Sequence, residues 1–557
     1  MTGTLVPDLA PAPDDPPAGP PPGDPVLDGR SLTVAMVVHV AGHPFSRVRL
    51  AMDAVDRLHE SRSLLRSLLD QGRPIYGVTT GFGDSADRQI TATSAAELQR
   101  NMIRYHLNGV GPTTPPEVVR ATLLIRANCL ARGSSAVNPA IVQRLLDLLR
   151  HDALPVIPER GSVGASGDLV PMCYIAAALS GEGELALDGV VRPATEVLAR
   201  LAIPVTDPEA KDGLALINGT SFSAAFAALA LAEAAELAVV AEAATALAAE
   251  ALTGNRGHYA AFIHEAKAHP GQVRSAAVIR RLLADSGLAL DHSQVLELNE
   301  PLGGQGFQRL RRTIQDRYSL RCAPHVIGVL RDTISWAGQW LETEINSSND
   351  NPLFDVGAGM VHSGGNFYGG HVAQAMDALK VAVASVADLL DRQVGLLVDE
   401  KFNNGLTPNL VSADLDRRQA GLHHGFKGMQ LAGSAVAAEA LAGCLPVSIF
   451  SRSTEAHNQD KVSMSPIAAR SARAVVGLAQ EMAAIHLVTA CQAVDLRGAD
   501  RAGRWTRQVR DLIRGVSPPV AGDRRLDGDV AAVLALIRNR RISPIVDAAA
   551  DTGGSHE

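Results

Sequence analysis

The chain has 557 residues, of which 46% are hydrophobic, 20% are charged and only 4% are aromatic. That length allows several domains, or one large helical body with a sizeable core. With 51 basic and 59 acidic residues the formal charge is -8, which argues against a nucleic-acid surface and against binding to anionic membranes. Five cysteines without a CxxC pair favour the reducing cytoplasm over a disulfide framework or a zinc site.

The two ends of the chain differ in composition from its centre. Residues 1–30 hold nine of the 31 prolines, and no apolar run there is long enough for an export signal. Such a segment cannot bury enough apolar surface to offset its ordering entropy, so we expect a disordered leader. Between it and a flexible tail over 544–557, we expect a mixed domain of helices, loops and short strands over 31–220 and a helical bundle over 221–543.

Two long helices are predicted in the second half. Residues 221–253 contain no glycine or proline and are rich in alanine, leucine and glutamate, which are among the residues best suited to a helix. A membrane span is the alternative for that length, but four glutamates between 233 and 250 would be expensive in hydrocarbon. Residues 371–394 repeat apolar side chains at steps of four and three, as in a bundle. Long bundles of this kind often pair with copies of themselves.

The segment GSVGASGDLVP, residues 161–171, is the most informative in the chain. Its centre can in principle cyclise, because Gly167 offers an unhindered amide nitrogen and Ala165 an unhindered carbonyl. Ser166 can then lose water to leave an exposed methylene group. The product would be a five-membered electrophile made from the chain itself, although the tripeptide alone is equally compatible with an ordinary turn.

The whole segment resembles the prosthetic-group segment of the aromatic amino-acid ammonia-lyase and aminomutase family, whose members form 4-methylidene-imidazol-5-one (MIO) from this tripeptide. Six further segments resemble motifs of that family and follow in its order. They are PIYGVTTGFG (74–83), LALINGTS (214–221), QDRYSLRCAP (315–324), EINSSNDNPLF (344–354), GGNFYG (364–369) and HNQDKVSM (457–464). The resemblance implies a mainly α fold, with an aspartase/fumarase-like long helical bundle and a smaller mixed N-terminal domain that bears the MIO. It also implies a homotetramer whose active sites are completed by several subunits.

The resemblance further implies roles for individual residues. Loss of ammonia requires an electrophile for the amine and a base for the β-proton. Tyr76, on the segment similar to the family's lid loop, would be the base and would need a depressed pKa to act near neutral pH. Arg321 would clamp the substrate carboxylate with its planar guanidinium, and Tyr318, on the same helical face, would handle protons. The remaining implied site residues are Asn218 and Gln315, as donors to the MIO carbonyls or the substrate carboxylate, and Asn366 and Phe367, which would line the pocket.

Two places bear on the substrate. Histidine ammonia-lyases carry Gln-Glu-Asp where this chain has Asn458-Gln459-Asp460, and the neutral Gln459 favours a phenyl or phenol ring over an imidazole. Tyr105 and His106 stand at the position of the ring-binding pair, where His106 offers a hydrogen bond to a phenol oxygen. No metal is implied, because no HExxH motif or His/Cys cluster occurs among the 17 histidines.

The sequence therefore predicts an aromatic amino-acid ammonia-lyase that acts on L-tyrosine or L-phenylalanine, with tyrosine favoured. An aromatic 2,3-aminomutase is the first alternative, because both enzymes eliminate ammonia and differ in whether the amine returns to the β-carbon. Histidine ammonia-lyase is the next alternative, and a catalytically silent helical scaffold is the last.

Overall fold

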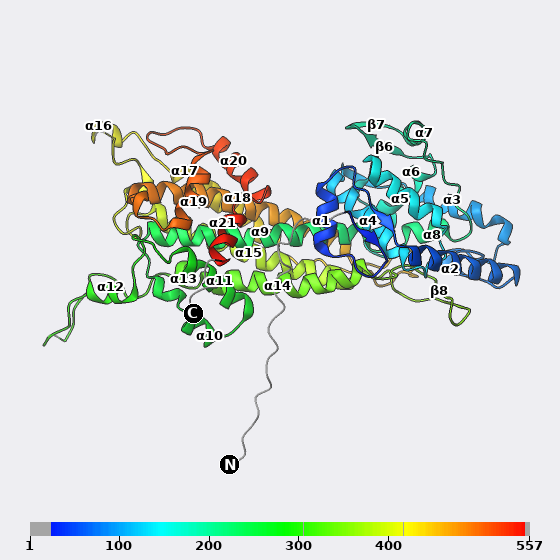
Figure 1. Cartoon of the computed structure of the whole chain (residues 1–557), viewed down its shortest axis with the longest axis horizontal. Helices are drawn as coiled ribbons and strands as arrows, with labels where there is room; N and C mark the ends of the chain where they lie inside the picture. Colours follow the sequence, from blue (N-terminus) through cyan, green and yellow to red (C-terminus); the bar gives the residue numbers. More distant parts are fainter. Residues whose placement is uncertain (1–23, 305, 416, 552–557) are drawn as a thin grey trace, which may run out of the picture.

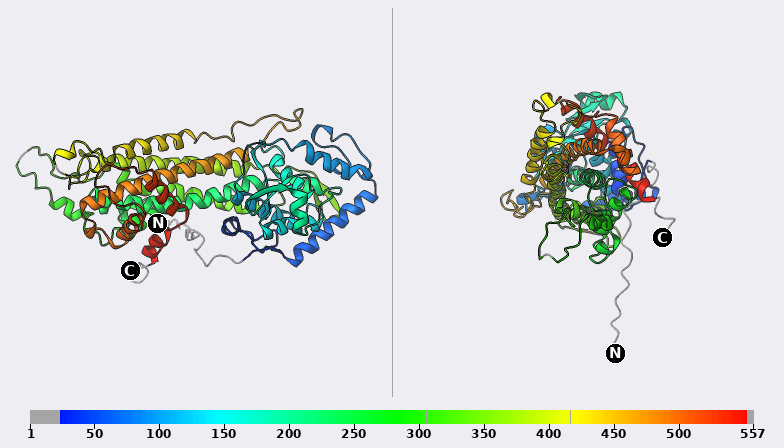
Figure 2. Two further views of the ribbon diagram at one scale, coloured as in Figure 1. Left: turned by 90° about the horizontal axis from the view of Figure 1, so that it is seen from above. Right: turned by 90° about the vertical axis from the view of Figure 1, so that its left-hand side faces the viewer.

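The structure is a computed structural model that describes residues 24–304, 306–415 and 417–551. It consists of an elongated helical bundle with a smaller mixed domain at one end, on the right of Figure 1. Figure 2 shows the bundle from above and end-on, with the long helices running roughly parallel. The predicted mainly α fold, with a long bundle and a smaller mixed domain, is confirmed.

The mixed domain contains short helices and two small antiparallel sheets, in which β3 pairs with β5 and the strand order of the other is β4-β6-β7. Its elements are β1 (Val26–Leu27), α1 (Val34–Gly42), β2 (Arg49–Leu50), α2 (Met52–Asp70), α3 (Ala95–Tyr105), β3 (Val110–Thr113), α4 (Pro116–Ala131), α5 (Pro139–His151), β4 (Leu154–Pro155), β5 (Pro158–Arg160), α6 (Leu169–Leu179), β6 (Glu184–Leu187), β7 (Val190–Pro193), α7 (Ala194–Arg200) and α8 (Asp212–Ile217).

The bundle is built on α9, α14, α15 and α18, which pack on one another along their lengths. Its helices are α9 (Ser221–Ala251), α10 (Ala261–Glu265), α11 (Pro270–Leu282), α12 (His292–Glu297), α13 (Tyr318–Arg321), α14 (Ala323–Ile345), α15 (Gly370–Val398), α16 (Arg417–Ala420), α17 (Lys427–Ala442), α18 (Ser465–Arg497), α19 (Arg504–Arg514), α20 (Asp527–Arg538) and α21 (Ser543–Asp551). Strand β8 (Leu353–Asp355), which pairs with β9 (Met360–His362), lies instead beside α2 of the mixed domain (Figure 1). The two predicted long helices are confirmed as α9 and α15. Small alanine side chains let the partners of α9 approach on every side, which explains why nearly all of that helix is buried.

Helices α9 and α18 are long and apolar enough to cross a membrane by length and composition alone. In each of them, 78% of the most apolar window is buried inside the bundle. Glu242 of α9 is also paired with Arg331 of α14 through two hydrogen bonds of 2.7 Å. The apolar surface of both helices is therefore covered by other helices of the same chain.

The structure differs from the predicted boundaries at both ends of the chain. Residues 26–27 of the expected leader form β1, which pairs in parallel with β2, while residues 1–23 lie outside the described residues. At the other end, residues 544–551 of the expected flexible tail belong to α21. Val546 and Ala549 are buried there, and the Ser543 hydroxyl donates to Glu236 at 2.8 Å. The tail was predicted from its low-complexity composition, but its small residues suit close packing on α9 and α11. Residues 552–557 lie outside the described residues.

Candidate active site

The loop that carries Ala165-Ser166-Gly167 has a backbone that favours glycine at two positions. Gly164 and Gly167 adopt φ values of 70° and 71°, in the left-handed region. A β-carbon on Gly167 would lie 2.2 Å from the carbonyl oxygen of Gly219. Gly167 is therefore required both by its conformation and by the close approach of a neighbouring backbone.

Two other segments of the chain hold this loop in place. On one side, the Asp168 amide donates to the Gly219 carbonyl at 2.7 Å, just before α9. On the other side, the Ser463 hydroxyl donates to the Gly164 carbonyl at 3.0 Å, and the Met464 amide donates to Val163 at 2.9 Å. The loop is thus fixed between the starts of α9 and α18.

Three helices begin around the loop. Helix α6 starts at Leu169, α9 at Ser221 and α18 at Ser465, and each is preceded by a residue that contacts the loop or belongs to it. The N-terminus of a helix carries a partial positive charge from its unpaired amides. Together these termini favour negative charge on the carbonyl groups of the loop.

Ser166 receives two side-chain donors. The Asn218 amide donates to the Ser166 carbonyl oxygen at 2.7 Å, and the Gln459 amide donates to the Ser166 hydroxyl at 3.2 Å. Gln459 is itself oriented by the Thr454 hydroxyl, which donates to its side-chain oxygen at 2.9 Å. The structure thus brings Asn218 and Gln459, two of the residues implied by the motifs, to the predicted ring-forming serine.

Tyr76 belongs to the segment that was expected to close over a substrate. The Gly83 amide donates to its hydroxyl oxygen at 3.0 Å. Burial raises the pKa of Tyr76, the Gly83 donor lowers it, and the nearby Glu455 raises it further. The net direction is opposite to the depressed pKa that a base acting near neutral pH would need, because removal of the phenol from water outweighs the one amide donor.

Tyr105 and His106 lie at the end of α3, with ring centroids 4.3 Å apart. Tyr105 is 56% exposed, whereas His106 is half-buried and its Nδ1 is 2.9 Å from the Met102 carbonyl oxygen. A carbonyl only accepts, so Nδ1 carries the proton and Nε2 is left as an acceptor. Burial lowers the pKa of His106, so the ring is neutral near pH 7.

Helix α13, which begins at Tyr318 and ends at Arg321, lies in the part of the bundle away from the mixed domain (Figure 1), and Gln315 precedes it by three residues. Gln393 of α15 donates both to the Ser319 carbonyl, at 2.8 Å, and to Thr245 of α9, at 3.0 Å. Thr245 is 24 residues from the start of α9 at Ser221, which is about 36 Å along the helix. Within one chain, the predicted carboxylate clamp therefore does not meet Ser166.

Tyr318 and Arg321 contact each other, in agreement with the helical face that the sequence predicted them to share. The Arg321 guanidinium lies over the Tyr318 ring, 4.6 Å from its centroid, and Arg321 Nε donates to the Asp316 carbonyl at 3.1 Å. Tyr318 is 71% exposed and Gln315 is also exposed. Tyr318 and Gln315 are therefore presented at the surface of the chain, whereas Arg321 is half-buried.

Asn366 and Phe367 lie just before α15, and Asn458 lies before α18. Asn366 is exposed and donates to the Ser348 carbonyl at 3.1 Å, and Phe367 is half-buried just before α15. Asn458 is exposed, and its amide donates to the Glu455 carbonyl at 2.9 Å. None of the hydrogen bonds found among the described residues joins these three to Ser166.

Comparison with known proteins agrees with this geometry. The family described as aromatic amino acid lyase matches residues 32–515. This chain belongs to that family. It is 39% identical to a histidine ammonia-lyase of Gloeobacter violaceus, over 94% of this chain and 98% of that protein. It is 38% identical to a tyrosine ammonia-lyase of Cupriavidus metallidurans, over 93% and 97% of the two chains.

A third relative is a tyrosine aminomutase. The chain is 38% identical to the MIO-dependent tyrosine 2,3-aminomutase of Streptomyces globisporus, over 91% of this chain and 93% of that protein. The crystal structure of tyrosine aminomutase from the same organism superposes with a TM-score of 0.89, at 36% identity, over 94% of this chain and 99% of the other. The chain is thus an enzyme of a family that contains ammonia-lyases and aminomutases.

The motifs did not single out Glu455, which this aromatic amino-acid lyase places against the segment of Tyr76. A β-carbon on Gly83 would come within 1.8 Å of Glu455 Oε1, so the carboxylate fills the space that glycine leaves. Glu455 Oε2 is buried without a hydrogen-bond partner, and burial followed by the nearby Asp84 raises the pKa of the carboxyl group. The one feature of the sequence that could have identified Glu455 is its position four residues before Gln459.

The lyase also buries two carboxylates behind the loop. Asp168 accepts from the Ser223 amide at 2.7 Å, and Glu344 accepts from the Thr220 hydroxyl. Burial raises the pKa of Asp168 to about 7 and raises that of Glu344 as well. Among the described residues, no group of three or more His, Cys, Asp or Glu side chains is arranged to hold a metal ion.

Proposed function

We propose that this enzyme is an ammonia-lyase that converts L-tyrosine, or L-phenylalanine, to the corresponding arylacrylate, with an MIO formed from Ala165-Ser166-Gly167. The observation that carries the proposal is the constrained loop, in which buried Gly167 leaves no room for a β-carbon. The carbonyl and hydroxyl of Ser166 each receive an amide donor, as the formation of such a ring requires. The residues present therefore fit the prosthetic group.

The remaining residues supply binding and proton transfer. The MIO supplies an electrophile for the substrate amine. Tyr76 is the base for the β-proton, and its raised pKa makes the phenolate strongly basic while keeping it scarce near neutral pH. Asn218 stabilises negative charge on the oxygen at Ser166, as a preorganised donor does in an oxyanion hole.

The pocket residues support a phenol ring in preference to an imidazole ring. The unprotonated Nε2 of His106 can accept the hydroxyl hydrogen of a tyrosine substrate. Gln459 carries no charge, whereas a carboxylate there would favour the imidazole of histidine. The three relatives have nearly the same identity but different substrates, so the pocket residues are the better guide.

The separation of Arg321 from Ser166 supports a shared active site. Arg321 lies near Thr245, which is about 36 Å along α9 from the start of that helix beside the loop, so a clamp that reaches the substrate must come from another copy of the chain. Several large apolar side chains are exposed on or beside α17, as expected of a surface that meets another copy. They are Leu422, Leu431, Leu445 and Ile449. We therefore propose the homotetramer with active sites built from more than one subunit.

Mixing two inactive variants tests the shared site. Ser166→Ala removes the electrophile, and Arg321→Ala removes the carboxylate clamp. In a refolded one-to-one mixture, about one quarter of the sites combine an intact serine with an intact arginine if the two come from different chains. Recovered activity is expected, and a mixture as inactive as its components would contradict the arrangement.

The activity itself is tested with the purified enzyme. It is incubated separately with L-tyrosine, L-phenylalanine and L-histidine, and acrylates are separated from β-amino acids by chromatography. Accumulation of 4-coumarate from tyrosine supports the lyase, and β-tyrosine would support the aminomutase, the alternative favoured by the structural likeness to tyrosine aminomutase. Urocanate as the main product would contradict the proposed substrate, and Ser166→Ala is the inactive control.

The cellular location is a further part of the proposal. All five cysteines are free, and Cys129, Cys173 and Cys491 are buried. Free thiols are typical of a reducing compartment, which supports a cytoplasmic enzyme.

A further inference from the structure

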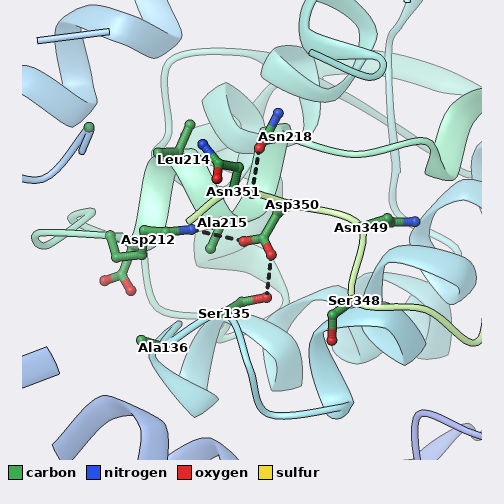
Figure 3. A network of polar contacts seen from close by, with 12 residues as sticks. Ser135, Ala136, Asp212, Leu214, Ala215, Asn218, Ser348, Asn349, Asp350 and Asn351 are labelled. Atoms are coloured by element: carbon green, nitrogen blue, oxygen red, sulfur yellow. Dashed lines mark hydrogen bonds and ion pairs between the residues drawn. The ribbon is translucent and has the colours of Figure 1, made fainter. Parts of the chain in front are cut away.

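Residues 349–351 form a buried polar segment near the ring-forming loop. Asn349, Asp350 and Asn351 are almost completely buried, and each binds a different part of the mixed domain. Figure 3 shows Asp350 between Ser135 and helix α8, with Asn351 beside Asn218. The segment therefore lies along α8, which is capped by Lys211 at its N-terminus and by Asn218 at its C-terminus.

The first contact is an ion pair at the start of α8. Lys211 Nζ donates to Asp350 at 2.8 Å, and the side chains of both residues are fully buried. The Ser135 hydroxyl donates to the other carboxylate oxygen at 3.0 Å. Because neither charge reaches water, each depends on the other, and the pair fixes the position of residue 350 relative to α8.

The second contact is at the end of α8 and determines how the Asn218 amide points. The backbone amide of Asn351 donates to Asn218 Oδ1 at 2.8 Å. A backbone N–H can only donate, so the oxygen of the Asn218 side chain must face it. The Asn218 NH2 group is then directed at the Ser166 carbonyl oxygen, 2.7 Å away.

From these contacts we infer that Lys211 and Asp350 are positioning residues for MIO formation: their ion pair holds Asn351 in place, and Asn351 fixes the Asn218 amide as a donor to Ser166. The inference rests on the proposed function, since it concerns the same prosthetic group. Lys211 and Asp350 do not touch the substrate, and both act through Asn218.

The chemistry explains why that donor matters. Ring closure joins the Gly167 nitrogen to the Ala165 carbonyl carbon, and the Ala165 oxygen leaves as water with the amide protons of Gly167 and Ser166. The Ser166 hydroxyl leaves as the second water with the Cα proton of the same residue. As that proton departs, its electron pair is shared with the Ser166 carbonyl oxygen, which is the atom that Asn218 contacts. Gln459 donates to the hydroxyl that leaves.

The test measures maturation and not turnover. Wild-type protein and Asp350→Asn are purified, and the intact mass of each chain is compared with that of Ser166→Ala, corrected for the substitution. Wild type is expected to lack the mass of two water molecules. Most Asp350→Asn chains are expected to retain at least one of those waters, with a matching loss of the near-ultraviolet absorbance of the ring.

A second buried lysine–aspartate pair provides a matched control. Lys380 and Asp377 of α15 are also 2.8 Å apart, with side chains 0% and 3% exposed. Their other hydrogen bonds run to residues 445–448 and to Ser471. Asp377→Asn leaves an unpaired buried lysine, as Asp350→Asn does, and is expected to lose stability while keeping the full two-water deficit.

A double variant keeps the inference testable if Asp350→Asn does not fold. Lys211→Met combined with Asp350→Asn removes both charges of this pair, while the buried Arg126 guanidinium keeps its hydrogen bond to Asn349 at 3.0 Å. The side-chain amide introduced at position 350 still offers an acceptor oxygen to Ser135. Folding with incomplete maturation is expected. A folded Asp350→Asn or double variant with the complete two-water deficit would overturn the inference and leave the proposed function standing. A wild-type chain without the deficit would overturn both.

Discussion

Gly167→Ala probes the contact on which the site depends. In the left-handed region, alanine is less stable than glycine by about 1–2 kcal/mol. The new β-carbon would lie 2.2 Å from the Gly219 carbonyl oxygen, which cannot move freely because it accepts the Asp168 amide at 2.7 Å. Forcing the two backbones apart adds about 1–3 kcal/mol, so we expect a total of about 2–5 kcal/mol, concentrated in the loop.

Gly189→Ala is the matched control for this variant. Gly189 has a φ of 74°, close to the 71° of Gly167, but no atom lies within 4 Å of its β-carbon position. Gly189→Ala therefore carries the cost of the left-handed conformation, but its β-carbon does not meet a neighbouring backbone. Thermal unfolding and intact mass are measured for both variants. We expect Gly189→Ala to mature fully and Gly167→Ala to retain its waters, with the lower midpoint of unfolding. Equal midpoints and equal maturation would refute the reasoning from the close backbone approach.

Three further predictions concern the reaction. Tyr76→Phe is expected to abolish turnover while leaving the two-water mass deficit intact. In the wild type, kcat/KM should rise with pH until Tyr76 is ionised. Because the pKa of Tyr76 is raised, this rising limb of the pH profile should extend beyond about pH 10. Glu455→Gln removes a negative charge that raises the pKa of Tyr76, so the same limb should move to lower pH, and an unchanged pH profile would argue against that coupling. Gln459→Glu should shift the ratio of kcat/KM values toward histidine relative to tyrosine; no shift in a competition assay would remove Gln459 as a specificity residue.

The long helices could be predicted because their signals are local. Uninterrupted alanine, leucine and glutamate predicted α9 to within two residues of its end, and the apolar repeat predicted α15. The ring-forming loop was equally accessible, since the requirement for small residues on both sides of Ser166 follows from sterics alone. Asn218 and Gln459 were found only through the resemblance of their motifs.

Residues whose importance depends on burial were missed. Nothing local distinguishes Lys211 or Asp350 from surface residues, and they become an ion pair only when residues 139 positions apart are folded together. Glu455 likewise matters because it fills the space beside Gly83. The raised pKa of Tyr76 could not be predicted from the sequence for the same reason, since desolvation depends on what surrounds the phenol.

By itself the sequence determined the helical class, the tripeptide able to cyclise and the family motifs, because each depends on neighbours in the chain or on residue type. Only the tertiary structure decided which of those motifs meet. It brings Asn218 and Gln459 to Ser166, and it places Arg321 beside Thr245 of α9, about 36 Å along that helix from its start next to the loop. That separation is a consequence of the length of α9, which no single motif contains, and it is the reason that Arg321 and Ser166 of the same chain do not meet.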